Sequence, residues 1–127
     1  LLTLLMEQSW HPENASGGKK RRELVEIKSF LDEHYMEKIT LDSLAASFYI
    51  DKFYMSKIFK ETYGTTINAY ILSKRITQAK KMLRFTELSI DEIGSRAGMN
   101  DANYFSRSFK KLEGISPSEY KRTWENH

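Results

Sequence analysis

The chain has 127 residues, about the length of one domain, which is enough to bury roughly two-thirds of the surface that the unfolded chain exposes. Apolar residues make up 40% of it and charged residues 29%, so we expect a soluble globular chain without the roughly 20-residue apolar run of a membrane helix. The absence of cysteine excludes disulfides, thiolate zinc sites and cysteine nucleophiles, and the net charge of +3 does not by itself indicate nucleic acid.

Residues 1–21 are predicted to be the tail of an upstream domain followed by a linker. Residues 1–6 resemble the end of a helix, and residues 11–18 contain the proline, asparagine, serine and paired glycines that are typical of a linker. The run Lys19-Lys20-Arg21-Arg22 is interpreted as the solvated start of a helix, with a non-specific phosphate contact as the alternative.

Apolar residues then recur at helical spacing almost to the end of the chain. One helix is predicted at about residues 21–36, a short one after Thr40 as its N-cap, and a third that ends at Gly64. The apolar stripes of these helices consist of Ile27, Phe30, Leu31, Tyr35, Leu41, Leu44, Ala45, Phe48, Met55, Ile58, Phe59 and, facing the core with the last three, Thr62.

The second half of the chain continues this pattern. A longer helix is predicted at about residues 67–84 with Thr66 as its cap, and Ser89 with Glu92 and Ser116 with Glu119 form two capping boxes. The stripes here consist of Leu72, Ile76, Ala79, Leu83, Ile93, Ala97, Phe105, Phe109, Leu112, Tyr120 and Trp124. No segment alternates as a strand does, so the fold is predicted to be all-α with about seven helices.

The chain also contains an internal repeat. Leu41-Asp42-Ser43-Leu44-Ala45 resembles Ile90-Asp91-Glu92-Ile93-Gly94 at an offset of 49 residues, and Ser56-Lys57-Ile58-Phe59-Lys60 resembles Ser106-Arg107-Ser108-Phe109-Lys110 at an offset of 50. One extra residue is therefore expected in the turn of the second copy. Each copy reads as a short helix, a tight turn and a second helix ended by glycine, which is the plan of a helix-turn-helix.

The second helix of each copy has an outward face of matching composition. At about 100° per residue, the positions opposite the core are Phe53, Ser56, Lys57 and Lys60 in the first copy and Asn103, Ser106, Arg107 and Lys110 in the second. Neither face holds a carboxylate, whereas a face selected only for solubility usually mixes charges of both signs. Residues 52–84 contain eight cations and one acid, and this local positive charge favours binding to phosphate.

Several motifs keep fixed spacings over about 45 residues. They are Arg75-Ile76-Thr77-Gln78-Ala79-Lys80-Lys81-Met82-Leu83, Ser89-Ile90-Asp91-Glu92-Ile93, Gly98-Met99, Tyr104-Phe105-Ser106-Arg107-Ser108-Phe109-Lys110-Lys111 and Gly114-Ile115-Ser116-Pro117-Ser118-Glu119-Tyr120. With these motifs, residues 22–124 resemble the DNA-binding domain of the AraC/XylS family of bacterial transcription regulators.

The resemblance implies a helix-turn-helix subdomain at residues 22–65, a linker helix at 66–86 and a second such subdomain at 87–127, with both recognition helices in successive major grooves. A linker helix of about 18 residues spans about 27 Å, which is compatible with the separation of about 34 Å between successive grooves. The positions matching those that contact bases in the family are Phe53, Ser56, Lys57, Ala102, Asn103, Ser106 and Arg107.

Three residues depart from the family pattern. Tyr49 stands where glycine is common, Gly94 replaces the usual alanine, and Met99 replaces an aromatic residue. Tyr49 therefore predicts a strained first turn or a different capping geometry.

Most of the proposed base contacts have an alternative interpretation. Arg107 suits the O6 and N7 atoms of guanine, or else contacts phosphate, and Asn103 either reads adenine or caps its own helix. Phe53 either contacts a thymine methyl group or a sugar, or packs beneath the turn at Tyr49. Ser56 and Ser106 either bond to a base or phosphate or remain solvated.

Phosphate contacts are predicted for a second set of cations, namely Lys60, Lys74, Arg75, Lys110 and Lys111. For Arg75 the alternative is burial through packing of its stem. No cofactor is predicted, and no metal site is expected, because His11, His34 and His127 lie far apart in sequence.

The sequence thus predicts specific binding of double-stranded DNA that regulates bacterial transcription in the cytoplasm, as an activator that contacts RNA polymerase. An upstream domain is expected to sense an effector or a phosphorylation signal, and no membrane partner is expected. The alternative is a helical protein-interaction module, which would bind DNA weakly and without sensitivity to salt. Catalysis is rejected because the chain lacks a Ser/His/Asp arrangement and a glycine-rich phosphate loop, and because related DNA-repair alkyl transferases need a reactive cysteine.

Overall fold

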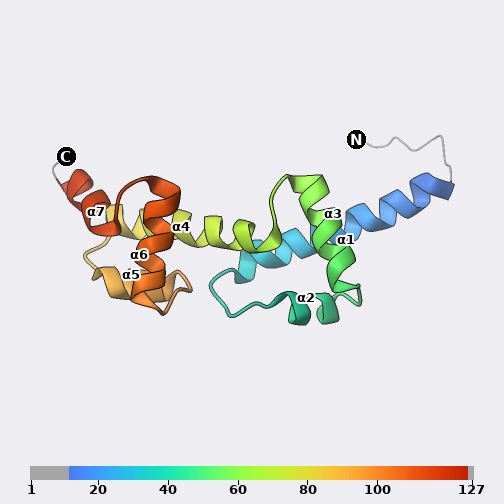
Figure 1. The fold of residues 1–127 in the computed structure, drawn as a ribbon, viewed down its shortest axis with the longest axis horizontal. Helices are drawn as coiled ribbons and strands as arrows, with labels where there is room; N and C mark the ends of the chain where they lie inside the picture. Colours follow the sequence, from blue (N-terminus) through green and yellow to red (C-terminus); the bar gives the residue numbers. More distant parts are fainter. Residues whose placement is uncertain (1–11, 126–127) are drawn as a thin grey trace.

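The fold is a chain of helices grouped around one long central helix (Figure 1). The structure is a computed structural model that describes residues 12–125, with side chains from residue 21 onward. Its seven helices are α1 (Pro12–His34), α2 (Leu41–Ser47), α3 (Lys52–Tyr63), α4 (Ile67–Phe85), α5 (Ile90–Arg96), α6 (Ala102–Glu113) and α7 (Pro117–Glu125). No strand occurs among these residues, which confirms the all-α prediction.

The first helix is longer than the sequence predicts. It begins at Pro12 rather than near residue 21, so the segment 12–18 is helical rather than a linker, and the basic run lies inside the helix rather than at its start. Proline suits the first helical position because the N–H that it lacks would be unpaired there, and each glycine weakens a helix by only about 1 kcal/mol. The predicted helix end at residues 1–6, together with His11 and His127, lies outside the described residues.

Side-chain caps begin every helix from α2 to α7. The capping oxygens belong to Thr40, Asp51, Thr66, Ser89, Asp101 and Ser116. The predicted capping box of α7 is confirmed, because the Ser116 N–H donates to Glu119 and the Glu119 N–H donates to Ser116. At α5, the Glu92 N–H donates to Ser89, but the Glu92 carboxylate pairs with Arg96 instead of turning back to Ser89. Each cap typically stabilises a helix by about 1 kcal/mol, so the helix starts are well defined.

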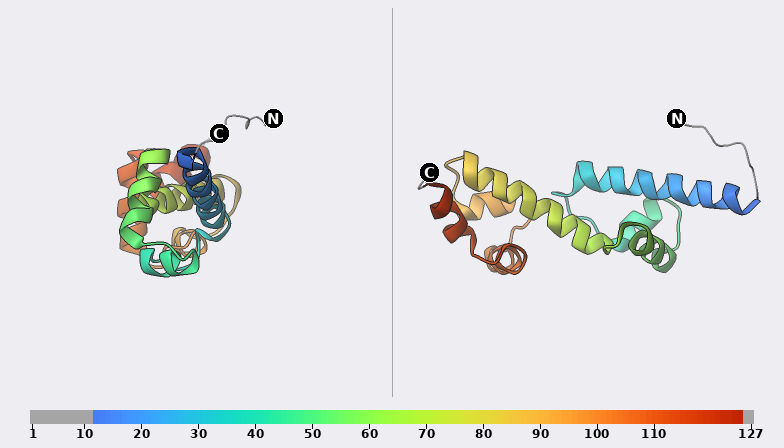
Figure 2. Two further views of the ribbon diagram at one scale, coloured as in Figure 1. Left: turned by 90° about the vertical axis from the view of Figure 1, so that its right-hand side faces the viewer. Right: turned by 90° about the horizontal axis from the view of Figure 1, so that it is seen from above.

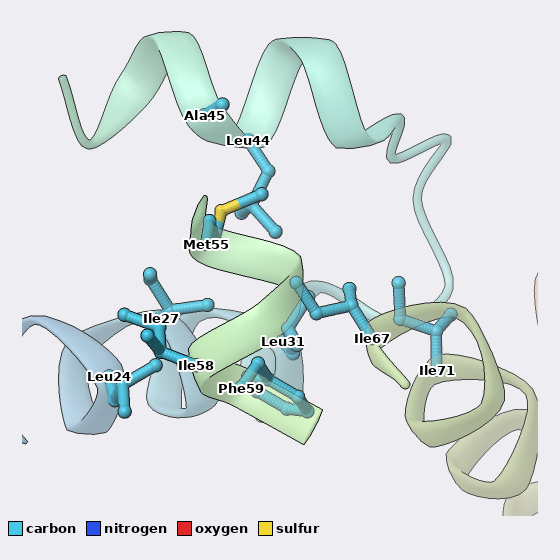
Figure 3. Packing of buried hydrophobic residues seen from close by; sticks show 10 residues of the cluster. All are labelled: Leu24, Ile27, Leu31, Leu44, Ala45, Met55, Ile58, Phe59, Ile67 and Ile71. Atoms are coloured by element: carbon cyan, nitrogen blue, oxygen red, sulfur yellow. The ribbon is translucent and has the colours of Figure 1, made fainter. Parts of the chain in front are cut away.

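Two separate apolar cores hold the helices together, and α4 contributes to both. The first core consists of Leu24, Ile27, Leu31, Leu44, Ala45, Met55, Ile58, Phe59, Ile67 and Ile71 (Figure 3). The second consists of Ile76, Ala79, Leu83, Ile93, Ala97, Met99, Phe105 and Phe109. Gly94 lies under the ring of Phe105, where a Cβ would be 2.7 Å from Cδ2, so this position needs glycine for close packing. The predicted pair of subdomains joined by a long helix is therefore confirmed.

Two residues predicted to face the core are exposed. Thr62 and Leu112 occupy corresponding positions in α3 and α6, and Leu112 is 46% exposed. Both lie in the last turn of a helix, which extends beyond the core that the earlier turns cover. Ser108, at the position that corresponds to Ile58, is buried instead.

The turns of the two motifs have one backbone plan with different residues. The Ile50 N–H donates to Ala45 O at 3.0 Å, and the Met99 N–H donates to Gly94 O at 2.7 Å, so both copies close the first helix in the same way. The residue before each donor is left-handed, with φ of +54° at Tyr49 and +101° at Gly98. The predicted strain at Tyr49 is confirmed. The offset is still 49 residues at these bonds and becomes 50 at the next caps, so the extra residue of the second copy is Asn100.

The two subdomains lie at opposite ends of α4, which crosses the middle of the molecule (Figure 1). Of the helices in the described range, none has the length and apolar character needed to span a bilayer.

Candidate nucleic-acid interface

The second helices of the two motifs, α3 and α6, lie on the same side of the molecule. Viewed from above in Figure 2, both are seen nearly end-on and beside α4, and in Figure 1 they run in similar directions. The central helix α4 has 19 residues, which corresponds to about 28 Å at 1.5 Å per residue. The arrangement therefore presents two roughly parallel helices to one surface.

The outward face of α3 is polar except for one exposed ring. Phe53 is 76% exposed, so the predicted alternative in which it packs beneath the turn is wrong. Lys57 and Lys60 are exposed, and Ser56 is half-buried. On the opposite face Met55 and Phe59 are fully buried, which fixes the rotation of α3 and points these four side chains outward.

A hollow of about 370 Å³ adjoins this face of α3. It is lined by Ser56, Lys57 and Lys60 together with Leu41 and the first turn of α4. Two ammonium groups border it, so this edge of α3 is electropositive.

The outward face of α6 repeats that of α3. Asn103 and Arg107 are exposed, as is Ala102 at the helix start. The cap of α6 is Asp101, whose carboxylate accepts from the Asn103 N–H at 2.9 Å, so the alternative in which Asn103 caps its own helix is wrong. The side chains of Asn103 and Arg107 are thus presented to solvent beside Ser106.

The two faces correspond in burial as well as in sequence. At an offset of 50 residues, each exposed position of one helix matches an exposed position of the other, and Ser56 and Ser106 are both half-buried. The paired positions are Phe53 with Asn103, Ser56 with Ser106, Lys57 with Arg107 and Lys60 with Lys110. Because the scaffold is repeated, the same four directions in space carry different chemistry in each motif.

Sequence reasoning missed Lys52, which corresponds to Ala102 at the start of the second helix. Its Nζ lies 2.9 Å from an Asp42 carboxylate oxygen and 5.1 Å from the centroid of the Phe53 ring. The offset of 50 residues was the signal that could have drawn attention to it. Lys52 therefore adds a cation beside the exposed ring of Phe53, and Asp42 holds it in place.

The cations predicted to contact phosphate fall into two groups. Lys60, Lys110 and Lys111 are exposed along the last turns of α3 and α6. Lys74 and Arg75, in contrast, have partners inside the protein, so the structure does not group them with the exposed cations.

Lys74 belongs to a polar cluster between α1 and α4. Its Nζ lies 3.0 Å from Asp32, which also accepts a hydrogen bond from the Tyr70 hydroxyl and pairs with Lys28 at 3.7 Å. Partial burial favours the neutral form of Asp32, but the hydrogen bonds from Tyr70 and Lys74 outweigh it and lower the pKa of the carboxyl below its usual value. The hydrogen bond to Asp32 in turn raises the pKa of Lys74. The cluster fastens α1 to the linker helix.

Arg75 donates to two backbone carbonyls in the connection that follows α1. Its Nε lies 2.6 Å from Tyr35 O and its Nη2 lies 2.8 Å from Glu37 O. Burial lowers the pKa of the guanidinium from its usual value. The alternative predicted for Arg75, burial of its stem, agrees with this environment.

A family described as a helix-turn-helix domain matches residues 44–123, which include both motifs and the helix between them. The chain belongs to the AraC family of DNA-binding transcription regulators. The resemblance that the sequence indicated is therefore confirmed, as are DNA binding and transcription regulation as the function of this domain.

Relatives of this AraC-type domain include the uncharacterized HTH-type transcriptional regulator YijO of Escherichia coli, which is 36% identical over 100 residues. The match covers 79% of this chain and 35% of YijO. The regulator YisR of Bacillus subtilis is 37% identical, with 81% of this chain and 36% of YisR covered. The chain thus spans about a third of the length of these relatives.

Among solved structures, the C-terminal domain of the two-component response regulator yesN from Fusobacterium nucleatum is 35% identical, with a TM-score of 0.72. The similarity covers 75% of this chain and 93% of that domain. Likeness in fold extends to the DNA-binding domain of AdpA in complex with a target DNA, at a TM-score of 0.77 and 24% identity over 82% of this chain and 94% of the other.

Proposed function

We propose that the two motifs bind double-stranded DNA together, with α3 and α6 in successive major grooves on one face of the duplex. The observation that supports this most is the pair of matched outward faces on two helices that lie on the same side of α4. Successive major grooves recur about every 34 Å along one face of DNA, and a linker helix of about 28 Å is compatible with that separation.

We assign base contacts to the outward positions of both helices. The set consists of Phe53, Ser56 and Lys57 in α3 and Ala102, Asn103, Ser106 and Arg107 in α6. Arg107 has the fork of donors that suits guanine, and Asn103 has the donor and acceptor that suit adenine. Phe53 offers an apolar surface to a thymine methyl group.

Phosphate contacts are assigned to Lys60, Lys110 and Lys111, because these cations are exposed beside the reading positions. Lys74 and Arg75 are left out of this set, because their charged groups already have partners within the protein.

We further propose that the domain acts in the bacterial cytoplasm as an activator that contacts RNA polymerase. An upstream domain would supply the signal, either an effector or phosphorylation. The yesN relative, which is part of a two-component response regulator, favours the second kind of signal. No reaction is assigned to this chain, since it offers no cysteine nucleophile.

Selection of random-sequence duplexes on this chain, followed by titration across a salt series, tests the proposal. We expect two short boxes about one helical turn apart and a log–log salt slope that grows by about 0.9 for each phosphate neutralised. Enrichment of one box only would mean that a single motif reads DNA. No enrichment with a flat salt response would instead favour a protein-interaction module.

A further inference from the structure

The two subdomains touch at a point away from α4, where the turn of the second motif meets the connection that follows α1. Gly98 lies in that turn, and a Cβ there would be 2.8 Å from Met36 Cα and 2.9 Å from Met36 O. Backbone atoms cannot rotate away as the end of a side chain can, so only glycine fits this contact at a φ of +101°. Figure 1 shows the two connecting segments approaching each other beside the middle of α4.

Arg75 fills the space between these two segments and the linker helix. Its guanidinium donates to the carbonyls of Tyr35 and Glu37 in the first subdomain, and its Nε lies 2.9 Å from the Cβ position of Gly98 in the second. It also interacts electrostatically with Tyr104 of α6. One side chain near the middle of α4 therefore contacts both subdomains.

We propose that Arg75, together with the contact between Gly98 and Met36, locks α3 and α6 in one relative position and thereby sets the spacing of the two DNA boxes that the protein accepts. Arg75 is then a positioning residue rather than a contact to DNA. Relative motion is the default for units joined by a small interface, and a second contact away from the axis of α4 removes that freedom.

The lock is a property of the protein without DNA, whereas its effect on box spacing rests on the proposed function. The two parts therefore need separate experiments, so that failure of one is distinguishable from failure of the other.

The first experiment measures the distance between the recognition helices in the absence of DNA. The chain has no cysteine, so Thr62→Cys and Leu112→Cys, at exposed corresponding positions of α3 and α6, create two unique sites for spin labels. Electron–electron resonance then gives the distribution of distances between the labels. We expect a narrow distribution in this parent and a wider one after Arg75→Lys, which keeps the charge but loses the fork of donors.

Two pairs of variants separate the lock from other effects. Gly98→Ala adds a methyl group against Met36, whereas Gly114→Ala adds one in the same subdomain at a similar positive φ with nothing within 4 Å. Only Gly98→Ala is expected to widen the distribution. Arg75→Gln is compared with Lys81→Gln, which removes an exposed cation from the same helix and should leave the width unchanged. Thermal unfolding of each variant confirms that both subdomains are folded.

The second experiment uses duplexes that carry both boxes, with one base pair added or removed between them. One base pair moves the second box by about 3.4 Å along the duplex and rotates it by about 35°. We expect the preference of the parent for its native spacing to fall by a factor on the order of ten in Arg75→Lys and Gly98→Ala, which lies within the usual range of coupling between linked sites. Binding to a duplex with one box should not change.

Unchanged distance distributions in both Arg75→Lys and Gly98→Ala would overturn the lock, and so would equal widening by Gly114→Ala. An equal loss of affinity at every spacing in Arg75→Gln, with a salt slope lower by about 0.9, would identify Arg75 as a phosphate contact instead. Absence of any selected box would refute the proposed function and leave the distance measurement to decide on the lock.

Discussion

The first motif presents Phe53, Ser56 and Lys57 on α3, and the second presents Asn103, Ser106 and Arg107 in the same places on α6. The buried and capping positions behind them are nearly identical, as shown by Phe59 with Phe109, Asp51 with Asp101 and Gly64 with Gly114. The scaffold is therefore repeated, whereas the reading surface is not. This difference teaches that the two motifs should recognise different base sequences, so that the bound site is asymmetric.

The two turns differ in a second respect, which concerns stability rather than recognition. Gly98 adopts its left-handed conformation without strain and uses the missing side chain to approach Met36, whereas Tyr49 holds a similar conformation with a side chain that is 95% exposed. The second turn is thus tied to the other subdomain, and the first turn stands free and strained.

Removing the two matched core rings should sharpen the comparison most. Phe59→Ala and Phe109→Ala each delete a fully buried ring, at a cost of about 3–5 kcal/mol in the free energy of unfolding. Because the cores are separate, each variant should lose amide-exchange protection mainly in its own subdomain. Equal loss of protection in both subdomains from either variant would show that they unfold as one unit.

Removing the two matched cations tests whether the reading surfaces are independent. Arg107→Ala should cost about 1–3 kcal/mol of binding free energy and relax the base preference of the second box only. Lys57→Ala should act on the first box alone, and Lys110→Ala should weaken all sequences alike. Titration of duplexes with single base changes in each box checks this, and relaxation of both boxes by one substitution would contradict the assignment.

The strained first turn offers a smaller effect in the opposite direction. Tyr49→Gly should raise the free energy of unfolding by about 0.5–1 kcal/mol, because relief of the left-handed strain exceeds the entropy cost of glycine. The tyrosine side chain is almost fully exposed, so little packing is lost. Urea unfolding measures the change, and a destabilised variant would mean that the ring makes a contact that offsets the strain.

The smallest expected effect concerns acid. The pKa of Asp32 is lower in the folded protein, so its contribution to stability is present above its unfolded pKa of about 3.9 and disappears as pH falls through its folded pKa. The side chain is one-third exposed, so the contribution should stay below about 1 kcal/mol. Asp32→Asn should flatten the loss of stability below pH about 4, and an unchanged acid profile would contradict this role.

Much of the architecture could be predicted because it depends on local signals. Helical spacing of apolar residues, Thr40, Thr66 and Ser116 as caps, and the repeat at 49 and 50 residues sufficed for the all-α fold and the two motifs. The outward faces of α3 and α6 followed from the helical period, because the residues opposite them form the buried face.

The remaining features depend on contacts between distant parts of the chain. Nothing near Arg75 in sequence shows that its guanidinium meets the carbonyls of Tyr35 and Glu37, 40 and 38 residues away. The exposure of Thr62 and Leu112 likewise depends on where the core ends. The start of α1 was misplaced because a glycine pair lowers helix propensity without abolishing a helix.

The central claim is that both motifs engage one face of DNA at the same time. Hydroxyl-radical footprinting of this chain on a selected duplex tests it most directly. The account predicts two protected segments about one helical turn apart on the same face of the duplex, with Arg107→Ala weakening protection in only one of them. A single protected segment, or two segments on opposite faces, would contradict it.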